Sequence, residues 1–295
     1  MPSLRACAEA SDCRLVVTQP DRPAGRGHKL QPTPVKRVAL ELGIATLEPL
    51  RLRDAVEALR ACGADVFALA SYGKIVPQAV LDLPPLGALN VHPSLLPLYR
   101  GATPLQAQLR DGVTEGGVTI MLMDAGLDTG AVVLQRATPI GPGEDYGGLH
   151  DRLAALGAAM LREVLDAATR GPLARTPQSA LGIAPERIAA TATRPLEKAD
   201  LELDWAWSAR RIANHVRSLA PAPGSRAELA GERVKILAVS EAEAGRPASP
   251  GTILGVAGDA AIVACGDGAV RVARLVPPNR GAMDGAAFGR AKVAS

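Results

Sequence analysis

The chain of 295 residues is long enough for one large domain and one smaller domain, since domains usually hold about 100–200 residues. Its 47% hydrophobic and 21% charged residues are typical of a globular protein, and a net charge of +3 argues against a protein that coats nucleic acid non-specifically. No apolar run reaches the roughly 18 residues of a membrane span, and the N-terminus lacks the layout of a signal peptide, so we expect a cytoplasmic protein without a membrane partner.

The cysteine pattern supports neither a metal site nor disulfide chemistry. None of the four cysteines belongs to a CxxC pair; they are Cys7, Cys13, Cys62 and Cys265. We therefore expect reduced thiols and no bound metal.

Residues 1–169 alternate between apolar or β-branched runs and helical patterns. Strands are predicted at 14–18, 65–70, 87–91, 117–123 and 131–138, and helices at 2–11, 34–43, 52–62, 76–83 and 146–168. Strands that alternate with helices favour right-handed βαβ crossovers. The prediction is a Rossmann-like α/β domain with a mostly parallel sheet, whose ligands bind beyond the carboxyl ends of the strands.

The second half of the chain has a different periodicity. Residues 170–203 are rich in Pro, Ala and Thr, which suits a linker, and a helix is predicted at 208–219. Short runs with a period of two then predict strands at 234–241, 251–256, 260–265 and 269–276. The pattern predicts a smaller β-barrel domain at 204–295, of the OB-like kind that often handles nucleic acid.

The segment 89–104, LNVHPSLLPLYRGATP, carries the most informative polar residues. Asn90 and His92 are two positions apart at the carboxyl end of a predicted strand, so their side chains project from the same face. Transfer of an acyl or formyl group to an amine needs an oxyanion donor and a proton carrier, which an Asn amide and an imidazole can supply. The alternative is that the two residues merely terminate the strand.

This segment and the later MDAGLDTG, residues 123–130, resemble the signature of the folate-dependent formyltransferases. The resemblance implies that Asn90, His92 and Asp128 form the catalytic set. Asn90 and His92 would contact the formyl oxygen, while Asp128 would orient His92 and help to relay protons. Asp124 is expected to cap the turn with its side chain instead.

The same resemblance implies a folate site. The segment SLLP, which comprises Ser94, Leu95, Leu96 and Pro97, matches the family segment that lines this site, so the expected formyl donor is 10-formyltetrahydrofolate, with no metal. A hydrolase that uses Ser94 with His92 and Asp128 fits less well, because the chain has no GxSxG elbow.

A basic loop at 18–36, TQPDRPAGRGHKLQPTPVK, carries Arg22, Arg26, Lys29 and Lys36. Loops of this composition are usually solvated connectors. Here the loop resembles the insertion by which family members that act on methionyl-tRNA enter the acceptor stem, and Arg26 matches the arginine most associated with tRNA contact. The resemblance therefore implies tRNA contact by these four residues, since guanidinium suits phosphates and base edges.

Residues 196–205, LEKADLELDW, resemble the family's motif at the domain junction and retain Lys198, Asp204 and Trp205. We expect Trp205 to be an amphipathic anchor between the domains. Basic residues on the predicted strands are candidates either for further tRNA contact or simply for solvation; they are Arg233, Lys235, Arg271 and Arg274.

The chain departs from the family pattern at three places. Family members open with a further strand ahead of the helix at 2–11, and that strand would be central in the parallel sheet, so its lack exposes two apolar strand edges. We expect the true start to lie upstream. The family's PWPxxW stretch reads PAPGSR at 221–226, and Ala192 stands where a tyrosine is expected, so aromatic packing is reduced.

The expectation from the whole sequence is a monomeric enzyme that moves the formyl group of 10-formyltetrahydrofolate onto the amino group of initiator methionyl-tRNA, for translation initiation. One alternative is formylation of an amino-sugar nucleotide, against which the basic loop and the β domain argue. The other is a truncated form that binds tRNA or folate weakly and is catalytically impaired.

Overall fold

The computed structural model describes residues 1–24 and 29–293, and the contacts of the chain divide it into two units. Unit 1 comprises Met1–Ala102, Gly116–Thr138 and Arg152–Ala192, and unit 2 comprises Thr103–Glu115, Pro139–Asp151 and Thr193–Ser295. Both units are interrupted in sequence, so a long helix can begin in one and end in the other. The predicted contiguous boundaries, 1–169, 170–203 and 204–295, stay a prediction.

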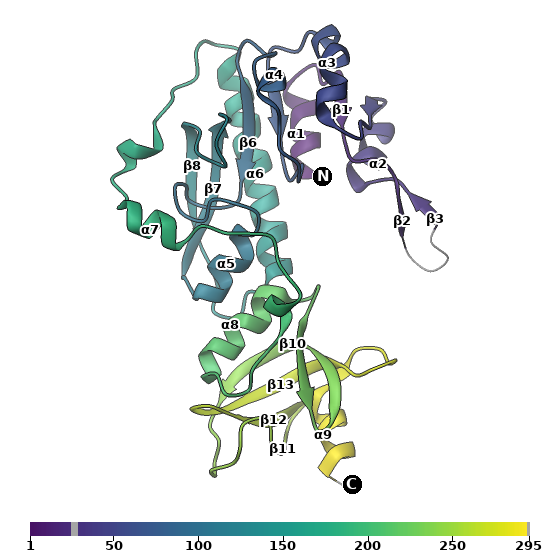
Figure 1. Cartoon of the computed structure of the whole chain (residues 1–295), viewed down its shortest axis with the longest axis vertical. Coiled ribbons are helices and arrows are strands. Elements are labelled where there is room, and N and C mark those ends of the chain that lie inside the picture. Colours follow the sequence, from purple (N-terminus) through teal and green to yellow (C-terminus); the bar gives the residue numbers. More distant parts are fainter. Residues whose placement is uncertain (25–28, 294–295) are drawn as a thin grey trace. The chain divides into compact units, whose positions relative to one another are not determined.

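Unit 1 is an α/β unit (Figure 1). The elements that lie wholly or mostly in it are α1 (Pro2–Ala10), β1 (Leu15–Val17), β2 (Arg22–Ala24), β3 (Lys29–Gln31), α2 (Pro34–Glu41), β4 (Ala45–Leu47), η1 (Leu52–Ala55), α3 (Val56–Cys62), β5 (Phe67–Leu69), α4 (Gln78–Leu81), β6 (Ala88–His92), β7 (Glu115–Leu122), β8 (Val132–Pro139), α6 (Tyr146–Ala168), η2 (Gln178–Leu181) and α7 (Pro185–Ala190). The sequence prediction omitted β2, β3 and β4, which are three residues each and too short to show a periodicity.

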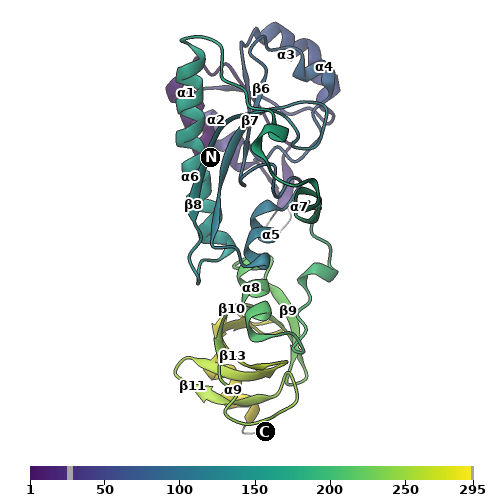
Figure 2. The ribbon, with the colours of Figure 1, turned by 90° about the vertical axis from the view of Figure 1, so that its left-hand side faces the viewer.

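Strand β6 is the inner strand that carries the candidate catalytic residues. It pairs in parallel with β5 and antiparallel with β7, and Leu89 within it is fully buried. Helix α6 runs along one face of this sheet (Figures 1 and 2). A Cβ atom at Gly157 of α6 would lie only 2.6 Å from Cγ1 of Val91, so glycine lets the helix pack tightly on the end of β6.

The parallel strand pairs of unit 1 lie in two separate sheets. One sheet pairs β1 with β4 in parallel, and the other has the order β5-β6-β7-β8. Among the described residues, no strand pairs with the second edge of β1 or of β5. The two sheets still share an apolar cluster that includes Leu15, Val17 and Phe67, and the Nε2 group of Gln19 donates to the carbonyl of Tyr72.

Unit 2 is built on an antiparallel sheet. Its elements are α5 (Pro104–Asp111), η3 (Ala199–Leu201), α8 (Ala209–Leu219), β9 (Ser225–Leu229), β10 (Glu232–Ala242), β11 (Ile253–Ala257), β12 (Ala260–Cys265), β13 (Gly268–Val276), β14 (Met283–Asp284) and α9 (Gly285–Val293). The strand order is β11-β12-β13-β10-β9, with β14 beside β13. This open sheet is consistent with the predicted OB-like domain, so the predicted fold class is confirmed for both parts of the chain.

The core of unit 2 explains Trp205. The indole is 8% exposed, packs among the apolar side chains of this unit and donates from Nε1 to the carbonyl of Glu228 at 2.8 Å. The structure therefore assigns Trp205 to the core of one unit, whereas the sequence suggested an anchor between domains. The indole keeps its polar N–H satisfied there, as a buried Trp requires.

The predicted linker is partly folded onto unit 1. Thr176 and Val132 exchange two backbone hydrogen bonds, of 2.9 and 2.8 Å, and Gln178 at the start of η2 is buried. A Pro-, Ala- and Thr-rich composition gave no sign of this attachment. None of the helices in the described ranges, 1–24 and 29–293, has the length and apolar character needed to cross a membrane.

Candidate active site

His92, the last residue of β6, is buried with a fixed ring orientation. Its side chain is about one-twentieth exposed, at 5%. The Nε2–H group donates to the carbonyl of Tyr99 at 3.0 Å, since a carbonyl can only accept. The ring's Nδ1 atom consequently faces the carboxylate of Asp128, with 3.7 Å between Nδ1 and Oδ2. The imidazole is therefore held between a fixed acceptor and a charge.

Asp128 is brought to His92 by the turn between β7 and β8. Its Oδ2 atom accepts a hydrogen bond from the backbone N–H of Gly101 at 2.8 Å. Asp128 has a φ of +54°, in the left-handed region that aspartate tolerates better than most residues. A Cβ at Gly130 would collide with the carbonyl oxygen of Leu122, so this position requires glycine. The turn therefore suits both the Asp and the Gly of the DTG sequence.

Burial and the nearby carboxylate act on His92 in opposite directions. Burial lowers the pKa of His92 below its ordinary value, while the Asp128 charge and the hydrogen bond to Tyr99 raise it, with burial the larger cause. The imidazole is thus neutral near pH 7, and a proton that it gains would be stabilised by the carboxylate. That is the behaviour required of a group that accepts and returns a proton.

Asn90 lies two residues before His92 on β6, so both side chains project from the same face, as the sequence predicted. Asn90 is half-buried and pairs with Leu69 of β5 and Met121 of β7. Its amide can donate to an oxygen that arrives above the strand end. Asn90 and Asp128 are more exposed than His92.

Asp124 caps the turn, which confirms the sequence prediction. Its Oδ1 atom accepts from the backbone N–H of Gly126 at 3.0 Å and from the hydroxyl of Thr129 at 2.6 Å. The Asp124 carboxylate is therefore used within the turn.

The SLLP segment is a tightly bonded loop. Ser94 is fully buried and donates from Oγ to the carbonyl of Leu98 at 2.7 Å, and Leu96 is 1% exposed within an apolar cluster. The hydroxyl of Thr119 donates to the carbonyl of Ser94, and the amide of Gln135 donates to the carbonyl of Leu96. The side chains of Ser94 and Leu96 thus shape the loop from the inside, and the folate assignment of Ser94–Pro97 stays a prediction.

The basic segment at 18–36 contains both an exposed arginine and a lysine that is already paired with carboxylates. Arg22 in β2 is exposed, whereas the ammonium of Lys36 contacts the carboxylates of Asp21 and Glu48 at 2.9 Å each. The hydrogen bonds to Glu48 and Asp21 raise the pKa of Lys36. Arg26 lies outside the described residues, as does the side chain of Lys29.

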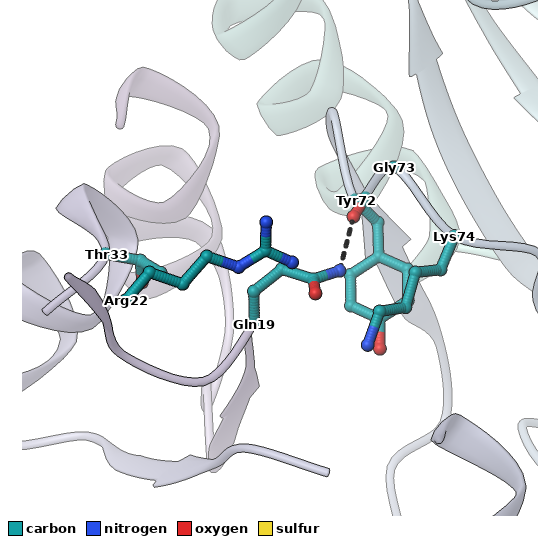
Figure 3. Close-up of a pocket in the computed structure, with 6 residues that line it drawn as sticks. All are labelled: Gln19, Arg22, Thr33, Tyr72, Gly73 and Lys74. Atoms are coloured by element: carbon teal, nitrogen blue, oxygen red, sulfur yellow. Dashed lines mark hydrogen bonds between the residues drawn. The ribbon is translucent and has the colours of Figure 1, made fainter. Parts of the chain in front are cut away.

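An open pocket of about 400 Å³ lies where β1 and β5 end (Figure 3). It is lined by Gln19, Arg22, Thr33, Tyr72, Gly73 and Lys74. The Oε1 atom of Gln19 and the hydroxyl of Tyr72 are buried there without a hydrogen-bond partner among the described residues. The sequence analysis did not single out Tyr72 and Lys74, although both closely follow a predicted strand, which is where such a fold places its ligands.

The sequence also did not predict the groups that hold the candidate catalytic residues. The backbone groups of Tyr99 and Gly101 carry no signal in a single sequence, and Gln178 lies in the predicted linker. In the ranges 1–24 and 29–293, no group of His, Cys, Asp and Glu is arranged to hold a metal ion.

Two family models match most of the chain. A model described as formyl transferase matches residues 3–165, and one described as formyl transferase, C-terminal domain, matches residues 195–292. The α/β unit with its imidazole–carboxylate pair and the antiparallel β unit are therefore those of the formyl transferase class.

Similar proteins narrow this class. The chain is 48% identical over 266 residues to the methionyl-tRNA formyltransferase of Aromatoleum aromaticum. This match covers 90% of this chain and 81% of that protein. It is 44% identical over 291 residues to the methionyl-tRNA formyltransferase of Pelobacter propionicus, covering 97% of this chain and 88% of that protein. The chain therefore belongs to the family of methionyl-tRNA formyltransferases.

Solved structures share the fold at lower identity. HypX from Aquifex aeolicus in complex with tetrahydrofolic acid has a TM-score of 0.65 and 18% identity, and the match covers 93% of this chain and 46% of HypX. The sugar 3N-formyl transferase WlaRD has a TM-score of 0.64 and 14% identity, with 95% of this chain and 94% of WlaRD covered. At these identities the likeness concerns the fold alone.

Proposed function

We propose that the chain transfers the formyl group of 10-formyltetrahydrofolate to the α-amino group of methionyl-tRNA, as an enzyme of translation initiation in the cytoplasm. The observation that carries the proposal is the buried His92–Asp128 pair at the end of β6, in a chain 44–49% identical to proteins named methionyl-tRNA formyltransferase. The pair has the chemistry that formyl transfer to an amine requires.

In the proposed reaction, the neutral amine of the methionyl group attacks the formyl carbon. A new C–N bond forms, and the carbonyl electrons move to oxygen. The Asn90 amide, on the same face as His92, donates to this oxyanion. His92 accepts the proton that the attacking nitrogen must lose, and Asp128 stabilises the resulting imidazolium across 3.7 Å. Collapse of the intermediate breaks the bond to N10 of the folate, which takes the proton and leaves as tetrahydrofolate.

We assign contact with the tRNA to Arg22 and, with it, to Arg26 and Lys29. Arg22 is exposed and free of acidic partners among the described residues, so its charge is available to a phosphate. We assign Lys36 to the base of the segment instead, because Asp21 and Glu48 already hold its ammonium.

The test is formyl transfer by the purified chain with 10-formyltetrahydrofolate and methionyl-tRNA. Transfer to the charged tRNA, and none to free methionine, is the expected result, with loss of transfer in His92→Ala. A parallel assay with an amino-sugar nucleotide as acceptor separates the main alternative. Transfer to the sugar nucleotide but not to the charged tRNA would overturn the proposal.

A further inference from the structure

Gln178 lies in the segment that the sequence predicted as a linker. The hydrogen bonds that the structure describes for its side-chain amide are all made to residues beside the candidate active site. The side chain is 5% exposed. Its Nε2 group donates to the carbonyl of Asp128 at 2.9 Å and to the carbonyl of Gly130 at 2.8 Å. Its Oε1 atom accepts from Nε and Nη2 of Arg100, at 3.1 and 2.7 Å.

These contacts join two loops that meet at the imidazole. Arg100 follows Tyr99, whose carbonyl anchors His92, and precedes Gly101, whose N–H binds the Asp128 carboxylate. Gln178 holds Arg100 on one side and the backbone of the Asp128 turn on the other. One amide group therefore links the loop that fixes the ring to the turn that fixes the charge.

The Asp128 turn needs such support. Its φ of +54° costs energy in a residue with a side chain, and such a conformation persists only where the surroundings hold it. The carbonyl groups on both sides of Thr129, those of Asp128 and Gly130, accept from the same Nε2 group. Loss of that donor would leave two inward-facing acceptors unpaired and free the turn to relax.

Gln178 is itself held rigidly. Two residues earlier, Thr176 and Val132 exchange backbone hydrogen bonds of 2.8 and 2.9 Å, which continue the edge of β8 into the linker segment. The neighbouring Ser179 is exposed, so the segment presents one inward amide beside an outward hydroxyl. A buried side chain whose rotamer is fixed by four hydrogen bonds, on an anchored backbone, is a good positioning element.

We propose that Gln178 is a positioning residue for formyl transfer, which sets the distance and direction of the Asp128 carboxylate relative to His92. The inference rests on the proposed function of the site. Gln178 touches no reacting atom: it acts through the two carbonyl groups of the turn and through Arg100.

The first test measures kcat and KM for formyl transfer by the full chain. Gln178→Met removes all four hydrogen bonds at similar volume, and Gln178→Glu keeps an acceptor for Arg100 but has no donor for the turn. Both should lower kcat by roughly 10-fold, less than the about 100-fold that a displacement of about 1 Å can cost, with KM for both substrates little changed. Ser179→Ala is the matched control and should behave as the parent. Full activity in Gln178→Glu would overturn the proposal.

A double substitution tests the route of the effect. Because Gln178 acts through Asp128, Gln178→Met should lower kcat far less in an Asp128→Ala background than in the parent. Equal fold-changes in the two backgrounds would mean that Gln178 only stabilises the fold, and the proposal would fail.

Amide hydrogen exchange decides the matter without catalysis. The N–H of Gly101 donates to Asp128, so Gln178→Met should speed its exchange, whereas Ser179→Ala should not. If the parent chain transfers no formyl group, the proposed function fails while this exchange still tests Gln178. Unchanged exchange at Gly101 in a folded Gln178→Met chain would overturn the positioning role.

Discussion

Two buried histidines, one in each unit, differ in what faces them. His92 and His215 are each 4% exposed, and burial lowers the pKa of both. His92 has the carbonyl of Tyr99 at one nitrogen and the carboxylate of Asp128 near the other. The Nε2 atom of His215 has no hydrogen-bond partner among the described residues, and its ring meets Trp207 edge-on at 5.1 Å between centroids.

His92 and His215 show that burial alone does not give a histidine the surroundings that proton transfer needs. Both environments disfavour the imidazolium. At His92 the Asp128 carboxylate lies 3.7 Å from Nδ1 and is the largest cause that raises the pKa, whereas at His215 the Asp200 charge is the smallest of the named causes.

Burial is the largest cause of the lowered pKa of His215, and the charges of Arg110 and Arg211 lower it as well. A hydrogen bond with the backbone of Leu201 and the charge of Asp200 raise this pKa. A buried histidine is therefore a candidate catalytic group only when a charge of the right sign faces it.

The largest expected effect is the loss of the imidazole in unit 1. His92→Ala should lower kcat by about 10³-fold, because general acid–base catalysis contributes roughly 10²–10⁴-fold. His215→Phe keeps the ring contact with Trp207 and should leave kcat within about two-fold of the parent, since it does not touch the reacting atoms. Single-turnover transfer to methionyl-tRNA measures both. Similar losses in the two variants would break the distinction.

The next largest effect is expected when the negative charge of Asp128 is removed while the size of its side chain is kept. Asp128→Asn keeps an oxygen acceptor for Gly101 and a residue type that tolerates a positive φ, but it no longer stabilises an imidazolium. We expect kcat to fall by roughly 10–100-fold, and the pKa of His92 to fall further because the Asp128 charge raises it in the parent. Transfer rates and an NMR titration of His92 check this. A raised pKa would contradict it.

His215 should affect the pH dependence of the free energy of unfolding rather than the rate of transfer. Burial lowers its pKa to about 4, from an ordinary 6.5. Between these values the unfolded chain binds more protons, so the free energy of unfolding falls as the pH is lowered from 6.5 towards 4. This group contributes roughly 3 kcal/mol over that window.

Substitution isolates that contribution. His215→Phe has no proton to gain, so its unfolding free energy, measured in denaturant at pH 7 and pH 4.5, should decline less than that of the parent. His92 adds a decline of the same sign in both proteins, because its pKa is also lowered. An unchanged pH dependence in His215→Phe would contradict the assignment.

The smallest effect is expected at Arg22. Arg22→Ala should raise KM for methionyl-tRNA by about three- to ten-fold, leave kcat unchanged and reduce the slope of log KM against log salt by roughly 0.7–0.9, the value for one phosphate contact. Arg5→Ala is the matched control, since this arginine is exposed and already paired with Glu41. A loss in kcat would place Arg22 with the chemistry rather than with recognition.

The sequence predicted local features well and distant contacts poorly. Alternation along a strand predicted that Asn90 and His92 share a face, and the turn-capping chemistry of an aspartate side chain predicted the role of Asp124. Asp128 was predicted only through a family resemblance, because the 35 residues between it and His92 carry no periodicity that brings the two together. Gln178 could not be found at all, since its role depends on a bridge between Thr176 and Val132 that composition does not encode.

The strands of unit 1 divide between two sheets, and among the described residues β1 and β5 each lack a partner on their other edge. What the sequence did not suggest is that Leu15, Val17 and Phe67 still meet in one apolar cluster, since side-chain packing between separate sheets follows from the tertiary fold. Short strands such as β4 also escaped prediction because three residues hold no period.

The open edges of β1 and β5 affect how copies of the chain meet one another. Each edge lacks a pairing strand in the part of the chain that the structure describes and lies beside apolar side chains, and such an edge is a template for a strand from a second molecule. Pairing between two molecules depends on protein concentration, whereas folding within one chain does not. Dilution therefore favours the monomer. Refolding yield should therefore decline as protein concentration rises, and the aggregated fraction should contain intermolecular strands that include 15–17 and 67–69.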